Sequence, residues 1–270
     1  MRKRDLWIVL CALCLAVVLG LHILLNNVMS TASWGLNFRQ EGQAPIGPAS
    51  ATQLARYDAA FLGNTEEKVI YLTFDDGPGP DTEKLLNILD RYGVKATFFV
   101  VDTPYVELLG EIARRGHAIG IHSASHDFRQ VYASEEAFFA DLTAMGNIIR
   151  QQAGVQTDLL RFPGGSSNTV SRFNPGIMTR LTKAAEEMGY VYFDWNVDSN
   201  DAGGAQTAWE VYDNVISGCK WLDEAVVLQH DTKPFSVDAV EWIIRWGRAN
   251  GYRFAALDEN SPMAHHDVQN

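Results

Sequence analysis

Over most of the chain, short apolar runs alternate with longer segments of helical periodicity, and this alternation is the strongest indication of the fold. The runs predict strands and the longer segments predict helices. Seven strands are expected, at residues 69–74, 96–101, 118–121, 159–162, 190–197, 225–229 and 253–257. Helices are expected between them, at residues 81–92, 106–115, 135–152, 177–188, 208–218 and 237–250.

Strict alternation of strands and helices is typical of a parallel sheet with helices outside it. We therefore predict one α/β domain over residues 66–259, with about seven parallel strands. Closing such a sheet gives a (β/α) barrel, whose active site lies at the C-terminal ends of the strands. The residues that follow each predicted strand are therefore the first candidates for chemistry.

The N-terminus has a different composition from the rest of the chain. Arg2, Lys3 and Arg4 precede an apolar run at residues 6–25. Twenty residues are long enough to cross a hydrocarbon layer of about 30 Å, and the basic cluster predicts that the N-terminus stays inside. We expect residues 1–30 to form a transmembrane helix, with residues 31–65 as a linker and the domain outside the cell membrane. The alternative is a cleaved signal segment and a secreted protein.

The charge of the chain restricts its partners. The net charge is −11 at pH 7. Nucleic-acid binding depends on Lys and Arg that neutralise phosphates, so we exclude a nucleic-acid partner and favour a neutral one. The last residues, 260–270, are polar and are expected to be a frayed tail, with His265 and His266 solvated. The sequence does not indicate an oligomeric state.

The first predicted strand ends in Thr-Phe-Asp-Asp-Gly-Pro, at residues 73–78. Asp-Gly and Gly-Pro are common in turns, so a plain turn is one interpretation. However, Asp75 and Asp76 are adjacent carboxylates that repel each other. A metal ion on one and a proton-transfer role for the other would explain the pair.

The third predicted strand ends in His122-Ser-Ala-Ser-His126. Two histidines four residues apart on a helical turn can present both rings to one ion, although they could also be two surface residues. Asp76 with His122 and His126 would give three protein ligands and leave one position open. That number is typical of a catalytic metal site, because structural zinc is closed by four ligands.

Three other predicted strands also end in ionisable residues. Arg161 is in the fourth strand, residues 194–201 contain three aspartates at the end of the fifth, and His230 follows the sixth. Each could separately be a solvated residue or a turn cap. Their joint occurrence at one face of a barrel instead indicates an active site.

These segments together resemble the polysaccharide deacetylases of carbohydrate esterase family 4, the NodB-homology domain. The matching segments are Thr-Phe-Asp-Asp-Gly-Pro, His-Ser-Ala-Ser-His, Arg-Phe-Pro-Gly (161–164), Asp-Ser-Asn-Asp (198–201) and Leu-Gln-His (228–230). The resemblance implies a deformed barrel of parallel strands. It also implies that Asp75 is the general base, that Asp76, His122 and His126 bind the metal, and that Arg161 holds Asp75.

The same resemblance implies that His230 is the general acid, tuned by Asp201, and that Leu228 lines the acetyl pocket. We expect the Gly164 N–H to stabilise the oxyanion and Trp195 to contact the substrate. Zinc is the favoured divalent metal, although cobalt, nickel and iron suit the same ligands.

In two places the sequence departs from the family pattern. Gly164 and Ala202 replace aromatic residues that usually line the sugar groove.

The expected activity is therefore metal-dependent removal of N-acetyl groups from an amino-sugar polymer, with peptidoglycan as the nearest candidate. Chitooligosaccharides or poly-N-acetylglucosamine are alternative substrates. Two other classes of function remain as hypotheses. A non-catalytic glycan-binding relic would have lost ligands, and none is lost here. An iron oxygenase would use two histidines and one carboxylate, but the additional Asp75 and His230 favour hydrolysis.

Overall fold

A computed structural model describes residues 68–270. The predicted membrane anchor and linker lie outside the described residues. No helix within residues 68–270 is both long and apolar enough to cross a membrane.

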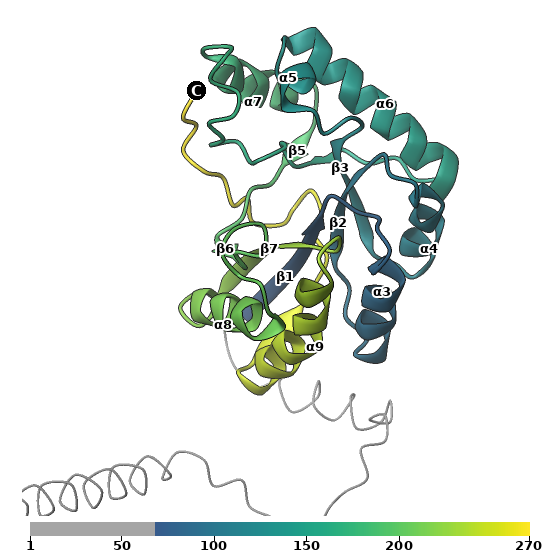
Figure 1. The fold of residues 1–270 in the computed structure, drawn as a ribbon, viewed down its shortest axis with the longest axis vertical. Coiled ribbons are helices and arrows are strands. Elements are labelled where there is room, and N and C mark those ends of the chain that lie inside the picture. The colour runs from purple at the N-terminus through teal and green to yellow at the C-terminus, as the bar shows by residue number, and fades with distance from the viewer. Residues whose placement is uncertain (1–67) are drawn as a thin grey trace, which may run out of the picture. The chain divides into compact units, whose positions relative to one another are not determined.

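The described residues form an α/β structure around one parallel sheet (Figure 1). The strand order is β5-β4-β3-β2-β1-β7-β6, and β8 pairs with the first half of β1. The bounds are β1 Lys68–Asp75, β2 Thr97–Val101, β3 Ala118–Ser123, β4 Leu159–Leu160, β5 Val191–Tyr192, β6 Val197–Asp198, β7 Glu224–His230 and β8 Tyr252–Phe254. A curled parallel sheet of the predicted kind is therefore confirmed.

The strand predicted at residues 190–197 is wrong in one respect, because it is split into β5 and β6. These two short strands lie at opposite ends of the strand order. Phe193 N–H donates to Leu160 O on the β4 side at 2.8 Å, and Asn196 N–H donates to Val226 O on the β7 side at 3.1 Å. The curl is thus closed by the connecting chain and not by a continuous ladder. Apolar periodicity cannot distinguish one long strand from two short ones that pair on different sides.

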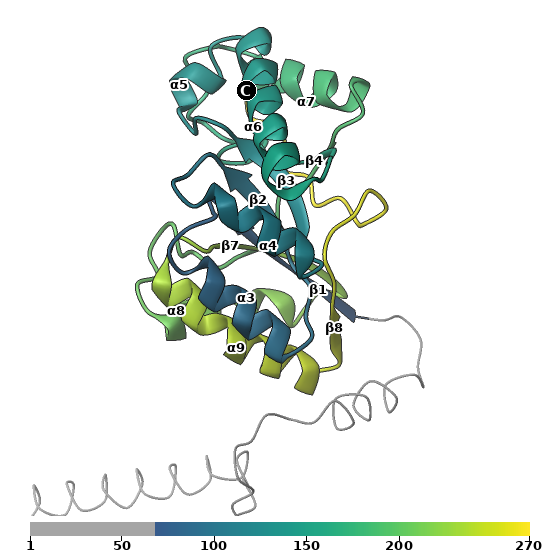
Figure 2. The ribbon, with the colours of Figure 1, turned by 90° about the vertical axis from the view of Figure 1, so that its right-hand side faces the viewer.

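Helices cover the outside of the sheet (Figures 1 and 2). Their bounds are α3 Thr82–Arg91, η2 Val106–Leu108, α4 Leu109–Arg114, α5 Phe128–Val131, α6 Glu135–Ala153, α7 Ile177–Glu187, α8 Ala208–Cys219 and α9 Pro234–Ala249. All the predicted helices are found, and α5 is an additional short helix. The ends of α6 follow from capping, because Ser134 accepts the Ala137 N–H and Gly154 adopts the left-handed conformation with φ 67°.

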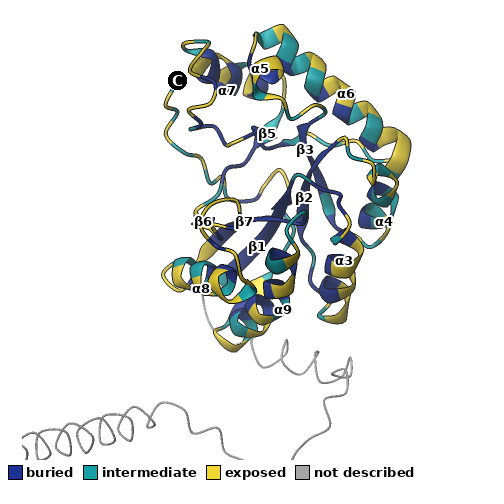
Figure 3. Cartoon of the chain, viewed as in Figure 1, coloured by how far each residue is buried: buried dark blue, intermediate teal, exposed yellow. Residues whose placement is uncertain are grey.

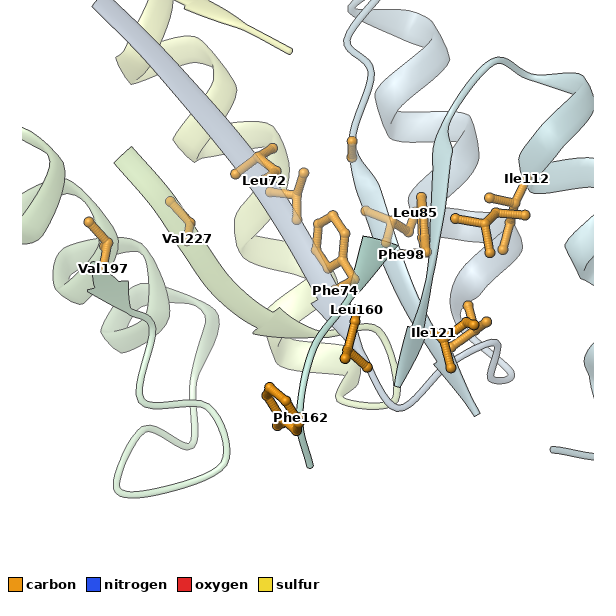
Figure 4. Close-up of a cluster of buried hydrophobic side chains, with 14 of the residues drawn as sticks. Leu72, Phe74, Leu85, Phe98, Ile112, Ile121, Leu160, Phe162, Val197 and Val227 are labelled. Carbon is orange, nitrogen blue, oxygen red and sulfur yellow. The ribbon is translucent and has the colours of Figure 1, made fainter. Parts of the chain in front are cut away.

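The alternation of side chains along β1 separates two environments. Ile70, Leu72 and Phe74 belong to the large core, in which Figure 4 shows Leu72 and Phe74. All residues of β1 except Lys68 are buried, and the ribbon of β1 is dark blue in Figure 3. Val69 and Tyr71 belong to a second, smaller cluster of buried residues, with Phe99, Phe193, Val226 and Leu257. Since side chains alternate with a period of two, the next residues on that same face are Thr73 and Asp75. Asp75, the first catalytic candidate, therefore lies on the same face of β1 as the smaller cluster.

The expectation of a frayed C-terminal tail is wrong. The His265 ring stacks on Tyr192 with 3.7 Å between ring centroids. The main-chain carbonyl of Asn270 accepts a hydrogen bond from Thr179 N–H at 2.9 Å, and Figure 1 shows the tail ending beside α7. The tail is polar because its partners are backbone groups and polar side chains, which a hydrophobic pattern does not reveal.

Candidate active site

Strand register brings the predicted residues together. In the parallel ladder between β1 and β7, Asp75 is the register partner of His230. Asp76 follows β1 directly, while His122 lies near the end of β3. The C-terminal strand ends therefore meet at one face, as expected for a barrel of this kind.

Asp76, His122 and His126 form the one group among the described residues whose ligand atoms could hold a metal ion, with all three atoms within 4.8 Å of one another. Asp76 Oδ1 lies 3.5 Å from His122 Nε2 and 3.2 Å from His126 Nε2. The same Oδ1 is buried and has no hydrogen-bond partner among the described residues. A buried carboxylate oxygen without a donor is costly, so a cation at this place would remove an existing penalty.

The protonation of His122 supports the same conclusion. Its Nδ1 lies 2.7 Å from the carbonyl oxygen of Arg161, so Nδ1 carries the proton of the neutral ring. Burial, the largest influence, lowers the pKa of His122. Nε2 of the neutral ring is then an unprotonated lone pair that faces Asp76 Oδ1. Two lone pairs repel unless a cation lies between them, and an Nδ1–H bound to a carbonyl is the usual support of a histidine ligand.

The expectation that His122 and His126 share a helical turn is wrong. His122 belongs to strand β3, and His126 lies in the following loop with a left-handed backbone, φ 49°. The loop is held by Asp141 of α6, whose carboxylate accepts hydrogen bonds from the N–H groups of Ala124 and Ser125 at 2.8 and 2.9 Å. The loop brings the two rings to 5.2 Å between centroids without a helix.

Unusual backbone conformations gather at this face. Within residues 68–270, the non-glycine residues with positive φ are Asp76, His126 and Asn200. Such conformations cost on the order of 1–3 kcal/mol and persist where the surroundings enforce them. At the Asp76 turn, a Cβ on Gly77 would lie 2.1 Å from Asp231 Oδ1, so any other residue would displace the buried Asp231 carboxylate.

Arg161 is fully buried and connects several parts of the site. Its Nη1 donates to Asp75 Oδ1 at 2.8 Å and to Thr73 Oγ1 at 2.6 Å. Its Nε and Nη2 donate to the carbonyl oxygens of Phe193 and Asp194 at 3.0 and 2.8 Å. The guanidinium thus links the end of β1 to the segment between β5 and β6, and it orients one oxygen of Asp75.

His230 and Asp201 form a bidentate pair. His230 Nδ1 and the His230 backbone N–H each lie 2.7 Å from one carboxylate oxygen of Asp201. Burial is the largest single influence on His230 and lowers its pKa. The hydrogen bond and negative charge of Asp201, with Asp75 and Asp76, outweigh burial and raise the pKa to about 9. The imidazolium is therefore the favoured form in the metal-free site.

Comparisons with known proteins agree with this geometry. The sequence matches the family model for polysaccharide deacetylase over residues 62–193. A peptidoglycan-N-acetylglucosamine deacetylase of Bacillus cereus is 35% identical over 208 residues, which cover 73% of this chain and 71% of that protein. The chain belongs to the polysaccharide deacetylase family. The resemblance inferred from the motifs is thereby confirmed, and the deacetylase is a hydrolase.

Two further relatives extend the comparison. A peptidoglycan-N-acetylmuramic acid deacetylase of Bacillus subtilis is 28% identical over 244 residues, with 84% of each chain covered. The catalytic domain of a peptidoglycan N-acetylglucosamine deacetylase from Eubacterium rectale is 54% identical, with a TM-score of 0.75 over 77% of this chain and 96% of that one. The similarity to the Eubacterium rectale domain therefore covers a larger share of the chain than the family-model match.

The predicted substrate contacts have different surroundings. Gly164 is exposed, and its N–H has no hydrogen-bond partner among the described residues, as an oxyanion donor requires. Trp195 is half-buried, while Leu228 is buried on the β7 strand. Each of the three lies on or beside a strand end of the candidate site, and their roles remain predictions.

The backbone explains why position 164 lacks an aromatic residue. Gly164 has φ 74°, and a Cβ there would lie 3.3 Å from the Asn168 Cβ. The Phe128 ring lies beside Gly164, 3.8 Å from the place that a Cβ on Gly164 would occupy. The centroid of this ring is 5.2 Å from that of His126. Phe128 therefore supplies an aromatic side chain where Gly164 has none. Phe162 cannot do so because it is buried in the core.

Sequence reasoning missed several residues that support the site. Asp141 binds backbone N–H groups of the His126 loop, and Thr73 binds Arg161. Asp194 was noted only as one of three aspartates that could cap a turn, and it binds the Ser166 N–H. Asp231 is fully buried against the Asp76 turn, and burial raises its pKa to about 7. Thr73 is the first residue of the motif at residues 73–78, and Asp231 follows the motif at residues 228–230, so their position was a usable signal. Asp141 lies in the middle of a helix and has no such signal.

Proposed function

We propose that this deacetylase is a metal-dependent enzyme that removes N-acetyl groups from amino-sugar polymers of the cell envelope, with peptidoglycan as its substrate. The names of the relatives from Bacillus and Eubacterium support the choice of polymer. The negative net charge of the chain also suits a glycan better than a polyanion.

One observation carries the proposal. The unpartnered Asp76 Oδ1 faces the Nε2 atoms of His122 and His126, while Asp75 and His230 lie side by side in the β1–β7 ladder. A cation site is thus adjacent to one carboxylate and one imidazole that do not belong to the ligand set. Hydrolysis of an amide requires these three parts: an electrophile, a base and an acid.

Zinc suits two imidazoles and one carboxylate, and when bound it would polarise the acetamide carbonyl. Asp75 would accept a proton from water as the water oxygen forms a bond to the carbonyl carbon. Arg161 holds Asp75 Oδ1, so the other carboxylate oxygen is the one that takes the proton. The Gly164 N–H would donate to the developing oxyanion.

Cleavage of the C–N bond requires a proton on the leaving nitrogen, since an amine anion is a poor leaving group. His230 would donate this proton from Nε2, because Nδ1 is held by Asp201 at 2.7 Å. Acetate and a free amine are the products. The Asp201 carboxylate favours the imidazolium that the donation requires.

The competing functions predict different results. A glycan-binding relic requires a damaged site, whereas the ligand atoms here lie within 4.8 Å. Chitooligosaccharides and poly-N-acetylglucosamine share the acetamide group and are the alternative substrates.

The decisive measurement is acetate release by the zinc-loaded and the chelator-treated chain from peptidoglycan, chitooligosaccharides and poly-N-acetylglucosamine. We expect zinc-dependent release that is largest on peptidoglycan, and a loss of about a thousandfold or more without metal. Full activity in a metal-free sample would contradict the metal dependence. Release from chitooligosaccharides alone would contradict the choice of polymer.

We also propose that the domain works outside the cell membrane, held by residues 1–30. The motive is the basic cluster followed by twenty largely apolar residues. Cell fractionation should recover the chain with membranes, and protease added to intact spheroplasts should cleave it. A mature N-terminus near Ser33 with release into the medium would instead support a secreted enzyme.

A further inference from the structure

The C-terminal residues 264–270 begin beside the segment between β5 and β6, to which Ala264 and His266 are hydrogen-bonded. Asp194 N–H donates to Ala264 O at 2.9 Å, and His266 N–H donates to Asp194 Oδ2 at 2.9 Å. Along the tail, exposed and half-buried residues alternate one by one. An alternation of this kind is typical of an extended segment with one side against the protein. The tail is therefore a built part of the domain.

Asp194 is the residue through which the tail reaches the site. Its side chain is fully buried and accepts hydrogen bonds from Ser166 N–H at 2.7 Å, from Ser166 Oγ and from His266 N–H. Its main-chain oxygen accepts the Arg161 Nη2–H at 2.8 Å. A buried carboxylate is tolerated only when donors replace its water. One residue thus joins the tail, the arginine that holds Asp75 and the loop that follows Gly164.

His266 also holds Trp195, the residue that follows Asp194. Its Nε2 lies 2.7 Å from the carbonyl oxygen of Trp195, and its ring meets the indole edge-to-face at 4.7 Å between centroids. Because a carbonyl only accepts, Nε2 carries the proton, and Nδ1 is then free to accept from Ser167 Oγ at 3.1 Å. Trp195 in turn packs against Gly165, where a Cβ would lie 3.0 Å from the indole.

These contacts have a consequence for catalysis. Besides Thr73, the carbonyl oxygens of Phe193 and Asp194 hold the guanidinium that orients Asp75. These two residues lie in a segment with little ladder pairing of its own, between the two-residue strands β5 and β6. The tail supplies further hydrogen bonds to this segment. Displacing a catalytic group by about 1 Å can cost a hundredfold in rate.

We propose that residues 264–270 are a positioning element for the reaction, and that Asp194 and His266 are positioning residues that act through Arg161, Gly164 and Trp195. This rests on the proposed function, because the positioned groups are those assigned to deacetylation. The tail itself contacts neither the predicted metal ligands nor Asp75 or His230.

The test compares the full chain with a chain that ends at Met263, both loaded with zinc and assayed for acetate release from peptidoglycan. We expect kcat to fall at least about tenfold, with KM and the zinc content within about threefold of the full chain. In His266→Ala kcat should fall less, and His266→Gln should restore part of it because its amide can donate to Trp195 O. The control is Asp267→Asn, an exposed neighbour, which should behave as the full chain.

Amide hydrogen exchange is a second measurement, and it does not depend on enzyme activity. In the chain that ends at Met263, exchange should rise about tenfold at the amides of residues 164–168 and 193–196, and stay unchanged in β1 and β7. Unchanged exchange there, or an unchanged kcat, would overturn the proposal. So would a loss of activity that follows only the unfolded fraction seen by circular dichroism. An inactive full-length chain would count against the proposed function. The exchange result would still show whether the tail orders residues 164–168 and 193–196.

Discussion

The two ends of the curled sheet bury polar groups in different ways. At the C-terminal ends of the strands, Asp75, Asp76 and Asp231 lie close together, and oxygen atoms of Asp76 and Asp231 have no hydrogen-bond partner among the described residues. At the N-terminal ends, Val69 and Tyr71 pack in an apolar cluster, with the neutral His117 just before β3.

This difference indicates that the C-terminal end of the sheet serves function and the N-terminal end serves stability. Burying several carboxylates at one place costs free energy unless a cation or proton is present, and the strained residues Asp76 and His126 add to that cost. The N-terminal end avoids a buried charge because its buried histidine is neutral, although His117 Nε2 also has no hydrogen-bond partner among the described residues. We therefore expect changes at the C-terminal end to alter activity and metal binding, and changes at the N-terminal end to alter stability.

The largest effect is expected from the two adjacent aspartates. Asp75→Asn should keep zinc and lower kcat by about 10²–10⁴-fold, because a base is removed and a ligand is not. Asp76→Asn should weaken zinc binding, since it removes a ligand charge. Zinc content and acetate release measured on both variants decide the assignment. Loss of zinc in Asp75→Asn with retention in Asp76→Asn would reverse it.

Asp231 tests the C-terminal end through stability. Burial, the main cause, raises its pKa from 3.8 to about 7. The folded chain then binds a proton that the unfolded chain has lost, so stability falls as the pH rises from about 4 to 7. Asp231→Asn should remove this decline, a gain on the order of 3–4 kcal/mol at pH 7 in the metal-free chain. Urea unfolding across this pH range measures it, and an identical pH dependence in the variant would refute the idea.

His117 tests the N-terminal end of the sheet, where stability should depend on pH in the opposite direction. Burial, the main cause, lowers its pKa from 6.5 to about 4. The unfolded chain takes up a proton first, so the stability present above pH 6.5 is lost as the pH falls towards 4, on the order of 2–3 kcal/mol. His117→Asn keeps an acceptor for the Ala96 N–H, which His117 Nδ1 now binds at 3.2 Å. It should flatten this part of the pH dependence and leave kcat unchanged at pH 7. A large loss of kcat would show that the two ends are not independent.

The smallest effect is expected in the substrate groove. Ala202 is exposed, and an aromatic ring there should stack on sugar, which contributes on the order of 1 kcal/mol. Ala202→Trp should therefore lower KM for chitooligosaccharides a few-fold and impair turnover of peptidoglycan. Gly164→Tyr is a poorer test because φ 74° strains any side chain. Equal KM values in wild type and Ala202→Trp would show that the groove wall lies elsewhere.

Much of the fold was predictable because its signals are local. The strands β1, β2, β3 and β7 lie in short apolar runs, and the longer helices have an amphipathic face, so the alternation predicts a curled parallel sheet. The closure of the sheet was not predictable. Whether residues 190–197 make one strand or two depends on partners at Leu160 and Val226, which lie far away in the sequence.

The sequence by itself determined which groups are available for chemistry: Asp75 and Asp76 after β1, His122 and His126 around the end of β3, Arg161 and His230 at two other strand ends. Strand ends carry these residues in short motifs, and parallel strands bring their ends to one face without further information. Only the tertiary structure decided how they are held. Asp141 shapes the His126 loop, the left-handed backbone of Gly164 leaves the ring of Phe128 beside it, and the tail reaches Arg161 through Asp194. These are hydrogen bonds and contacts between distant segments, and their geometry exists only after the chain has folded.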